Sequence, residues 1–270
     1  MTGSEDGEIM VDRQSEKRVL VPGIAGRSRA VVTTQYALMP AEGILASALP
    51  GFQGTTVRVQ TSPAMGARFA QMLLEIAPDG GTTALRDDGL EHVFYVIGGA
   101  LEFSLDGTAH TLAVGGYVYV PVGHAYGLRN ASAEECRVIW IKRPYEPIDV
   151  PVPAPIVGKR DELERNAPHT TGRYWQYLLP TDDLAFDMQV NILGFEPGTY
   201  FPYVETHVME HGLYMLEGQG IYLLAGDWHE VEPTDFIWMA PFCPQDFFCT
   251  GWGEAAYLLY KDVNRDVRFD

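Results

Sequence analysis

The apolar residues of this chain fall into short runs that are typical of β-strands. Two segments show this pattern most clearly, FYVIGGALEFSLDGTAHTLAVGGYVYVPVG (residues 94–123) and GLYMLEGQGIYLLAGDWHEVEPTDFIWMAP (residues 212–241). In both, β-branched and aromatic runs are interrupted by glycine-containing steps, and Gly226-Asp227 predicts a hairpin turn. Helical periodicity is weak, and the best candidate for a helix is the short charged segment Lys159–Ala167.

The two segments are copies of one another. Shifting the sequence by 119 positions, the separation of His92 from His211, holds the register without a gap from about residue 91 to 142. The matched pairs are Glu91 with Glu210, His92 with His211, Tyr95 with Tyr214, Gly99 with Gly218, Gly107 with Gly226, Lys142 with Lys261 and, further upstream, Pro78 with Pro197. Because glycine and proline fix special backbone angles, matched glycines and prolines imply matched turns. The sequence therefore predicts an internal duplication of one β unit.

This duplication predicts an all-β fold with two tandem barrels, since a closed or nearly closed barrel removes exposed strand edges. We expect an N-terminal tail and lead-in strand over residues 1–34 and an N-terminal barrel over residues 35–150. A proline-rich crossover with the short helix follows over residues 151–185, and the C-terminal barrel occupies residues 186–270.

The composition of the chain limits which kinds of molecule it can bind and where in the cell we expect it. The chain has 270 residues and is 46% hydrophobic, so it can bury a substantial core. Its net charge of −17 argues against binding nucleic acid or an anionic membrane surface. The N-terminus lacks the apolar core of a signal peptide, and Cys136, Cys243 and Cys249 are too scattered for a disulfide framework. We therefore expect a cytoplasmic protein that acts on a small molecule.

Three side chains of metal-binding type lie at the start of the second copy, in VETHVMEH (residues 204–211). In a helix, Glu205 and His207 would point about 160° apart. In an extended strand, Glu205, His207 and His211 have the same parity and point to one side. The strand pattern around them favours convergence. The order His-x-x-Glu-His also excludes the helical metalloprotease motif, in which the Glu directly follows the first His.

The spacing of these residues resembles the first motif of the cupin family. That motif consists of Gly, a spacer, His-x-His, three or four residues, Glu, six residues and Gly. This chain has in the same order Gly198, Glu205, His207, His211 and Gly218, so one Glu and one His are exchanged. The second cupin motif usually ends with a His, and TDFIWMAPFCPQ places Gln245 at that position. With two copies, the chain resembles a bicupin, which implies two double-stranded β-helix (jelly-roll) barrels.

The unusual Glu-x-His-x₃-His set with Gln, together with YLLYKDVNRDV near the C-terminus, resembles the (S)-ureidoglycine aminohydrolase family of allantoin degradation. The resemblance runs from roughly residue 35 to 268. It implies that manganese is bound by Glu205, His207, His211 and Gln245. It also implies that Tyr257 and Lys261 contact the substrate. The implied reaction is the hydrolytic release of ammonia from ureidoglycine to give ureidoglycolate.

The donor set is consistent with this chemistry. Two oxygen and two nitrogen ligands without a thiolate suit six-coordinate Mn²⁺ or Fe²⁺ better than structural zinc. An amine leaves only when protonated, and Lys261 is the candidate for that proton or for the substrate carboxylate. Tyr257 lies four residues before Lys261 and shares its strand face. We assign catalysis to Lys261 and Glu205, and substrate binding to Glu205, Gln245, Tyr257 and Lys261.

The first copy lacks this ligand set. Arg86, Asp88 and Tyr126 stand at the places of the Glu, the first His and the Gln, and only His92 is retained. Because an arginine cannot donate to a metal ion, we expect the N-terminal barrel to be degenerate and metal-free. Its expected role is packing or assembly.

Two other functions stay open on the sequence alone. Two His and one carboxylate around Fe²⁺ would make an oxygenase, although Gln245 leaves fewer open positions for substrate and oxygen. A non-catalytic small-molecule-binding cupin would bind without turnover. Tyr257 also fits a core position, and Lys261 has a duplicate in Lys142, which suits a structural role in both barrels. Bicupins commonly assemble, so we expect a homo-oligomer.

Overall fold

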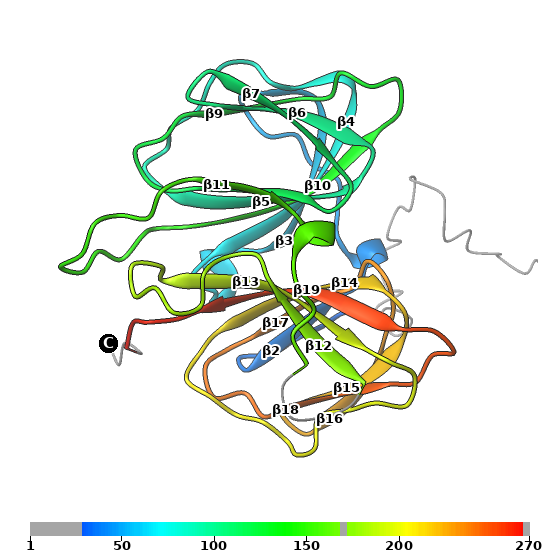
Figure 1. The fold of residues 1–270 in the computed structure, drawn as a ribbon. Helices are drawn as coiled ribbons and strands as arrows, with labels where there is room; N and C mark the ends of the chain where they lie inside the picture. The colour runs from blue at the N-terminus through cyan, green and yellow to red at the C-terminus, as the bar shows by residue number, and fades with distance from the viewer. Residues whose placement is uncertain (1–28, 168–171, 267–270) are drawn as a thin grey trace, which may run out of the picture.

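The computed structural model describes residues 29–167 and 172–266, which form two β-barrels packed against each other (Figure 1). The N-terminal barrel, at the top of Figure 1, is a single curled sheet with strand order β11-β8-β5-β10-β4-β9-β6-β7, and β3 pairs with β4. Its strands are β3 (Phe52–Thr61), β4 (Ala70–Thr82), β5 (Glu91–Gly98), β6 (Ala100–Leu105), β7 (Thr108–Ala113), β8 (Gly116–Val120), β9 (Tyr126–Arg129), β10 (Cys136–Arg143) and β11 (Ile156–Lys159).

The C-terminal barrel has a seven-stranded sheet, β1-β2-β17-β14-β19-β13-β12, and a three-stranded sheet, β16-β15-β18. Its strands are β1 (Val31–Val32), β2 (Tyr36–Met39), β12 (Arg173–Tyr177), β13 (Met188–Phe195), β14 (His211–Glu217), β15 (Gly220–Leu224), β16 (Asp227–Val231), β17 (Phe236–Met239), β18 (Gln245–Cys249) and β19 (Ala255–Asp262). The predicted all-β fold of two tandem barrels is confirmed.

The strand pairing repeats at the separation that the sequence predicts. In the N-terminal barrel His92 pairs with Lys142, and in the C-terminal barrel His211 pairs with Lys261. Two isolated bridges, Arg86 with Tyr126 and Glu205 with Gln245, repeat in the same way. The two barrels therefore share the same strand register around the candidate site.

The two halves of the chain exchange strands across the predicted domain boundaries. β2, near the N-terminus, pairs with β17 of the C-terminal barrel, as Ala37 pairs with Trp238. β11, in the predicted crossover, pairs with β8 of the N-terminal barrel, and β12 pairs with β13. The boundaries drawn at residues 35 and 151 thus separate strands from the sheets that contain them. Such long-range pairing leaves no signal in the local pattern.

The predicted helix Lys159–Ala167 is wrong. Lys159 ends β11, and only the 3₁₀ turn η4 (Arg160–Glu162) follows it. Asn166 then bridges to Trp175 on β12. Because the backbone at both ends of the segment is hydrogen-bonded to strands, too few residues remain between them for an α-helix. The other two 3₁₀ turns in the described residues are η2 (Ala41–Gly43) and η3 (Pro63–Met65).

The hairpin expected at Gly226-Asp227 lies one residue earlier. Leu224 pairs with Asp227, so the two turn residues are Ala225 and Gly226, with φ values of 60° and 151°. In the first copy, Asp106 and Gly107 form the equivalent turn with φ values of 48° and 83°. Each tight turn requires positive φ, which glycine adopts most easily.

Three apolar cores hold the molecule together, one inside each barrel and one between the barrels. Strand β19 shows how alternation divides them. Its odd-numbered residues Ala255, Tyr257 and Leu259 line the interior of the C-terminal barrel. Its even-numbered residues Ala256, Leu258 and Tyr260 face the N-terminal barrel. A residue of odd number on β19 therefore points into the C-terminal barrel.

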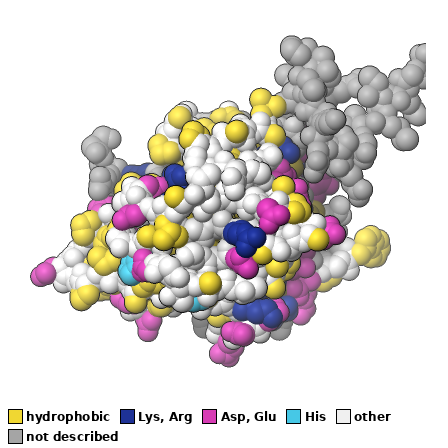
Figure 2. All heavy atoms as spheres, turned by 90° about the horizontal axis from the view of Figure 1, so that it is seen from above, with side chains coloured by type: hydrophobic (Ala, Val, Ile, Leu, Met, Phe, Trp, Pro, Cys, Tyr) yellow, Lys and Arg dark blue, Asp and Glu magenta, His cyan; other side chains and the backbone are white. Residues whose placement is uncertain are grey.

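The described surface matches the acidic composition. In the face shown in Figure 2, acidic side chains are spread widely and basic side chains form smaller patches. Within the described ranges, no helix has the length and apolar character needed to cross a membrane.

Candidate active site

The segment that carries the candidate ligands is a crossing between two sheets, which corrects the prediction of one continuous strand. Glu205 forms an isolated bridge with Gln245, at the edge of the three-stranded sheet. Strand β14 begins only at His211, which belongs to the seven-stranded sheet. Because the chain passes from one sheet to the other between these points, His207 lies at the mouth of the barrel in a non-strand conformation.

Strand parity directs three candidate residues into the C-terminal barrel. His211 has the parity of Leu213 and Met215, which line the interior. Gln245 has the parity of the interior residues Phe247 and Cys249. Lys261 follows the odd-numbered set of β19 and pairs directly with His211 across the sheet. These side chains therefore meet at one end of the barrel interior.

Short distances connect the crossing segment to the barrel wall. The rings of His207 and His211 lie 4.6 Å apart between centroids. Gln245 Nε2 lies 3.4 Å from His207 Nε2. The backbones of Glu205 and Gln245 exchange two hydrogen bonds, of 2.8 and 2.9 Å. Two imidazoles and one amide thus converge, and Glu205 is fixed beside them through its main chain.

The carboxylate of Glu205 does not complete a cluster at ligating distance. Within residues 29–167 and 172–266, no three His, Cys, Asp or Glu side chains gather closely enough to hold a metal ion. Binding by all four predicted residues therefore requires their side chains to draw closer together.

The electrostatic environment favours the neutral form of both histidines. Burial lowers the pKa of His207, and burial lowers the pKa of the fully enclosed His211 well below its usual range, helped by His207 and Lys261. A neutral imidazole has a free lone pair, which is the form that binds metal. Burial raises the pKa of the Glu205 carboxyl, while the positive charges of Arg173 and Lys261 oppose that rise.

Lys261 is a partly buried ammonium beside the two histidines. Burial lowers its pKa, and the nearby Glu205 opposes this change. No carboxylate of the described residues lies within ion-pair distance of it. The matching Lys142 has such a partner, because its Nζ lies 3.3 Å from Asp88. The two lysines therefore differ in chemistry although they share a strand position.

Tyr257 is part of the interior core and is only 1% exposed. Burial raises the pKa of Tyr257 well above its usual range, and the neighbouring Tyr222 and Glu205 add to this rise. Tyr222 in turn donates to Gln245 Oε1 at 3.1 Å. Tyr257 is thus a core aromatic, and Tyr222 is the tyrosine that contacts a candidate ligand.

Sequence reasoning missed two residues at this site, Tyr222 and Arg173. Tyr222 has the parity of Leu224 on β15, so its inward direction was readable once that strand was assigned. Arg173 lies on β12, far from any motif, with its guanidinium 4.7 Å from the Phe201 ring. Nothing local to the sequence indicates that its charge acts on Glu205.

The matching place in the N-terminal barrel is closed by internal partners. His92 Nδ1 accepts a hydrogen bond from Trp140 Nε1 at 3.0 Å. His92 Nε2 therefore carries its proton and donates it to Asp88 at 2.9 Å. The other oxygen of Asp88 binds Lys142. Neither nitrogen of His92 is left for a ligand.

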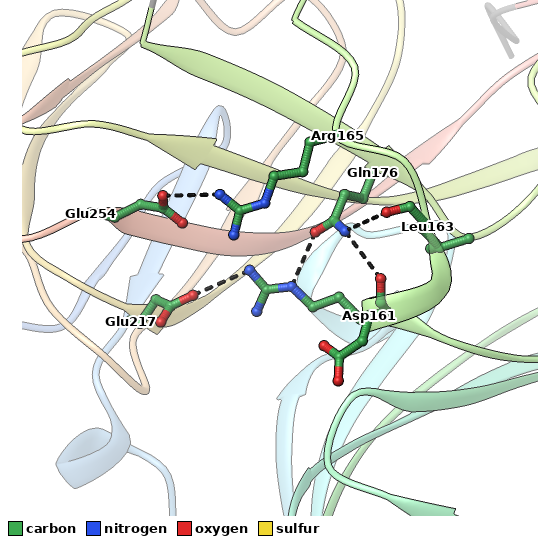
Figure 3. A pocket seen from close by; sticks show the side chains of 7 residues that line it. Asp161, Leu163, Arg165, Gln176, Glu217 and Glu254 are labelled. Carbon is green, nitrogen blue, oxygen red and sulfur yellow. Dashed lines mark hydrogen bonds and ion pairs between the residues drawn. The ribbon is translucent and has the colours of Figure 1, made fainter.

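A separate pocket of about 550 Å³ lies where the crossover meets the C-terminal barrel, and Figure 3 shows its lining. Its charged side chains bind one another, since Arg160 pairs with Glu217 and Arg165 with Glu254. Gln176 accepts from Arg160 Nε and donates to two backbone carbonyls. None of the predicted site residues lines this pocket, and its contacts join η4 to the barrel.

Comparison with known proteins agrees with the fold. The Cupin domain family matches residues 72–142, which lie in the N-terminal barrel. The Escherichia coli K12 protein named (S)-ureidoglycine aminohydrolase is 36% identical over 245 residues, covering 89% of this chain and 93% of the relative. The Arabidopsis thaliana protein of the same name is 32% identical over 246 residues, covering 90% of this chain and 80% of the relative.

A solved structure has the same fold. The crystal structure of protein Ylba from E. coli has a TM-score of 0.81 and 34% identity, and the match covers 90% of this chain and 97% of that one. The fold and these relatives together define a two-barrel cupin enzyme. More particularly, the chain belongs to the (S)-ureidoglycine aminohydrolase family, and it is a hydrolase.

Proposed function

We propose that this chain is an (S)-ureidoglycine aminohydrolase that uses Mn²⁺ in its C-terminal barrel. It releases ammonia from (S)-ureidoglycine and gives (S)-ureidoglycolate in allantoin degradation. The observation that carries the proposal is the convergence of His207, His211 and Gln245 beside Lys261 in one barrel. Family membership adds the reaction, because the curated relatives have this activity as their name.

The residues at the site fit a divalent ion. The lowered pKa values of His207 and His211 favour neutral imidazoles with available lone pairs, and Gln245 and Glu205 add an amide and a carboxylate oxygen. Such a set of oxygen and nitrogen donors suits Mn²⁺ and leaves coordination positions open. When bound, the ion would orient the reacting carbon and acidify a water molecule.

Lys261 has two tasks in this proposal, which follow from its place opposite His211. Its ammonium holds the carboxylate of the substrate by charge. It also stands where it can give a proton to the departing nitrogen, and burial lowers the pKa of Lys261 toward the range in which such a transfer is efficient. The carbon–nitrogen bond breaks as water supplies the oxygen of the new hydroxyl, and the nitrogen leaves as ammonia.

Glu205 and Tyr257 complete the substrate contacts. Glu205 carries the one carboxylate of the set, so it can also accept a hydrogen bond from the ureido or amine nitrogens. The Tyr257 hydroxyl lies in an apolar interior where water does not compete for it. Gln245 is neutral, which leaves the single negative charge of Glu205 to balance the ion and Lys261.

The experiment that tests the function is ammonia release from freshly generated (S)-ureidoglycine, with metal analysis of the same sample. We expect turnover with one Mn²⁺ per chain, loss after chelation and recovery on adding Mn²⁺. Because the substrate decays spontaneously, the product must be the single S enantiomer of ureidoglycolate. A racemic product at the uncatalysed rate would refute the proposal, and a requirement for oxygen would favour the Fe²⁺ oxygenase instead.

The homo-oligomer expected from the sequence is part of this proposal. Exposed apolar side chains flank the mouth of the C-terminal barrel at Tyr203, Val204, Val208 and Phe242. Such clusters commonly mark contact surfaces. Sedimentation analysis of the purified protein checks the assembly, and a monomer at micromolar concentration would refute it.

A further inference from the structure

Strand β13 places two side-chain amides, Gln189 and Asn191, on the interior face of the C-terminal barrel. The odd-numbered residues Leu193 and Phe195 of this strand belong to the interior core, whereas its even-numbered residues face the N-terminal barrel. Because successive side chains of a strand alternate between its two faces, Gln189 and Asn191 point the same way as Leu193. The apolar wall of the barrel therefore has a polar patch on β13.

This polar patch lies beside the candidate ligands. Gln189 pairs directly with Lys261, and Lys261 pairs with His211 on the next strand. These three residues form one row across β13, β19 and β14. Asn191 pairs with Leu259, so it is the diagonal neighbour of Lys261, at a separation of about 7 to 8 Å. One small molecule held by the Lys261 ammonium is therefore within reach of the Asn191 amide.

The amide oxygen of Asn191 is a buried acceptor without a donor. Asn191 is only 1% exposed, and its Oδ1 accepts no hydrogen bond from any of the described residues. Buried acceptors in folded proteins are nearly always hydrogen-bonded, and an unpaired one lowers stability. A ligand that brings an N–H group into the barrel would supply the donor that the protein itself does not.

The N-terminal barrel has apolar side chains at the two matching places. Ala70 pairs with Lys142 there, so it takes the position of Gln189. Two residues along the same strand, Met72 takes the position of Asn191 and is buried in the interior core. The barrel fold therefore does not require amides at these places. They occur in the barrel whose site is open to a ligand.

The ureido group is the part of the substrate that fits this patch. (S)-Ureidoglycine has a carboxylate, an amine and a ureido group, and the ureido group has N–H donors beside a carbonyl acceptor. The amine leaves in the proposed reaction, whereas the ureido group is the same in substrate and product. A side-chain amide is complementary to such a group, because it has both an acceptor and donors.

We propose that Asn191 is a specificity-determining residue whose Oδ1 accepts a hydrogen bond from the ureido N–H, while Lys261 holds the carboxylate of the same molecule. Gln189 is the second amide of this ureido subsite. The inference rests on the proposed function, since it takes (S)-ureidoglycine as the substrate. A site built in this way discriminates against molecules that lack the ureido group, because they leave Asn191 unpaired.

Steady-state kinetics of the Mn²⁺-loaded protein with fresh (S)-ureidoglycine give the first test. Asn191→Leu removes the amide and keeps a side chain of similar size. We expect it to raise KM about tenfold, the effect of one lost hydrogen bond. Because the ureido group is bound alike before and during the reaction, kcat should stay within about threefold. Met72→Leu, at the matching place of the N-terminal barrel, is the control and should change neither constant.

Titration calorimetry with two stable ligands identifies the group that Asn191 contacts. (S)-Ureidoglycolate and glycolate both have a carboxylate and a hydroxyl, and only the first has a ureido group. Asn191→Leu should weaken binding of (S)-ureidoglycolate about tenfold and binding of glycolate less than about twofold. Equal losses for the two ligands would overturn the inference. A raised KM with unchanged (S)-ureidoglycolate binding would also overturn it, since Asn191 would then contact the amine.

Urea unfolding separates a binding role from a structural one. Asn191→Leu replaces an unpaired buried amide by an apolar side chain, so the chelated variant should unfold at the same or a higher urea concentration. A clearly lower midpoint would show that Asn191 serves the core, against the inference. If Asn191→Leu does not fold, Gln189→Leu supplies the test, with an expected rise in KM of about threefold. An unchanged KM in that variant would overturn the ureido subsite.

The outcomes distinguish this inference from the proposed function. If the unchanged protein hydrolyses (S)-ureidoglycine while Asn191→Leu has the same KM and the same product affinity, the inference is wrong and the function stands. If the unchanged protein neither hydrolyses (S)-ureidoglycine nor binds (S)-ureidoglycolate, the proposed function falls and the inference falls with it.

Discussion

The two barrels of this chain have the same strand register and opposite chemistry at the same place. In the N-terminal barrel, Asp88 binds both His92 and Lys142, so every charge has a partner within the protein. In the C-terminal barrel, His207 and Lys261 have no such carboxylate between them among the described residues. The same duplicated β unit therefore contains a site closed by an internal ion pair in the N-terminal barrel and a site open to a ligand in the C-terminal barrel.

This comparison shows what a binding site requires beyond its fold. Both barrels have the conserved pairing of His with Lys on neighbouring strands. The difference lies in side chains at the mouth and on the facing sheet. A buried lone pair or charge without a partner lowers the stability of the folded protein. A ligand that supplies the missing partner therefore stabilises the site.

The largest expected effect comes from removing the retained histidine in each barrel. His211→Ala should lower ammonia release by more than about a hundredfold and abolish Mn²⁺ binding, because losing a ligand exceeds the typical cost of losing an outer hydrogen bond. His92→Ala, its matched control, should keep both. Assays with metal analysis measure these changes, and equal losses in both variants would contradict the division of roles.

The two lysines should differ almost as much. Lys261→Met should reduce kcat by about 10²- to 10⁴-fold while Mn²⁺ content stays normal, because proton transfer typically contributes that factor. Lys142→Met should leave kcat near that of the unchanged protein. Normal turnover in Lys261→Met would refute its assigned role.

We expect a substitution in the N-terminal barrel to lower stability, and the matched type of substitution in the C-terminal barrel to weaken metal binding instead. Asp88→Asn breaks the ion pair with Lys142 and should lower the free energy of unfolding by about 1 kcal/mol, since the pair is partly exposed. Glu205→Gln should leave the stability of the metal-free protein nearly unchanged while weakening Mn²⁺ binding. Urea titration of the chelated proteins measures both, and a larger destabilisation in Glu205→Gln would contradict the comparison.

The smallest expected effect is a pH dependence of stability from the N-terminal barrel. Burial lowers the pKa of His92, and the hydrogen bond from His92 lowers the pKa of Asp88. His92 is less protonated in the folded state, so its contribution is present above the unfolded pKa of His, 6.5, and is lost as pH falls. The contribution of Asp88 has the same sign but is lost only below the unfolded pKa of its carboxyl, 3.8.

Urea midpoints between pH 7 and pH 5 check this expectation. The unchanged protein should lose stability on acidification, and His92→Gln should lose less because glutamine does not titrate in this range. His207 and His211 contribute in the same direction, so part of the slope remains. A steeper slope in His92→Gln would show that the sign is wrong.

The sequence predicted the fold because duplication and turn residues are local signals. Matched glycines located the turns, and parity on β19 placed Tyr257 and Lys261 on one inward face. The pairing of β2 with the C-terminal barrel and of β11 with the N-terminal barrel escaped prediction, since pairing between segments that are distant in sequence leaves no periodicity. The helix predicted over Lys159–Ala167 was wrong because the charged pattern of this segment is typical of a helix, whereas both of its ends pair with strands.

The candidate site was predicted in part, because the spacing of its motif residues is also a local signal. Cupin spacing brought His207, His211 and Gln245 to notice, and these residues do converge in the structure. The backbone that brings them together differs from the predicted continuous strand, because the chain crosses between two sheets before His211. Tyr222 and Arg173 lie outside the motifs, and their roles come from three-dimensional proximity that no spacing encodes.

The most direct measurement of the central claim is anomalous diffraction at the manganese edge from crystals grown with Mn²⁺. One peak per chain is predicted, in the C-terminal barrel, within ligating distance of His207, His211, Gln245 and a repositioned Glu205. No peak there, or a peak beside His92 in the N-terminal barrel, would contradict the account.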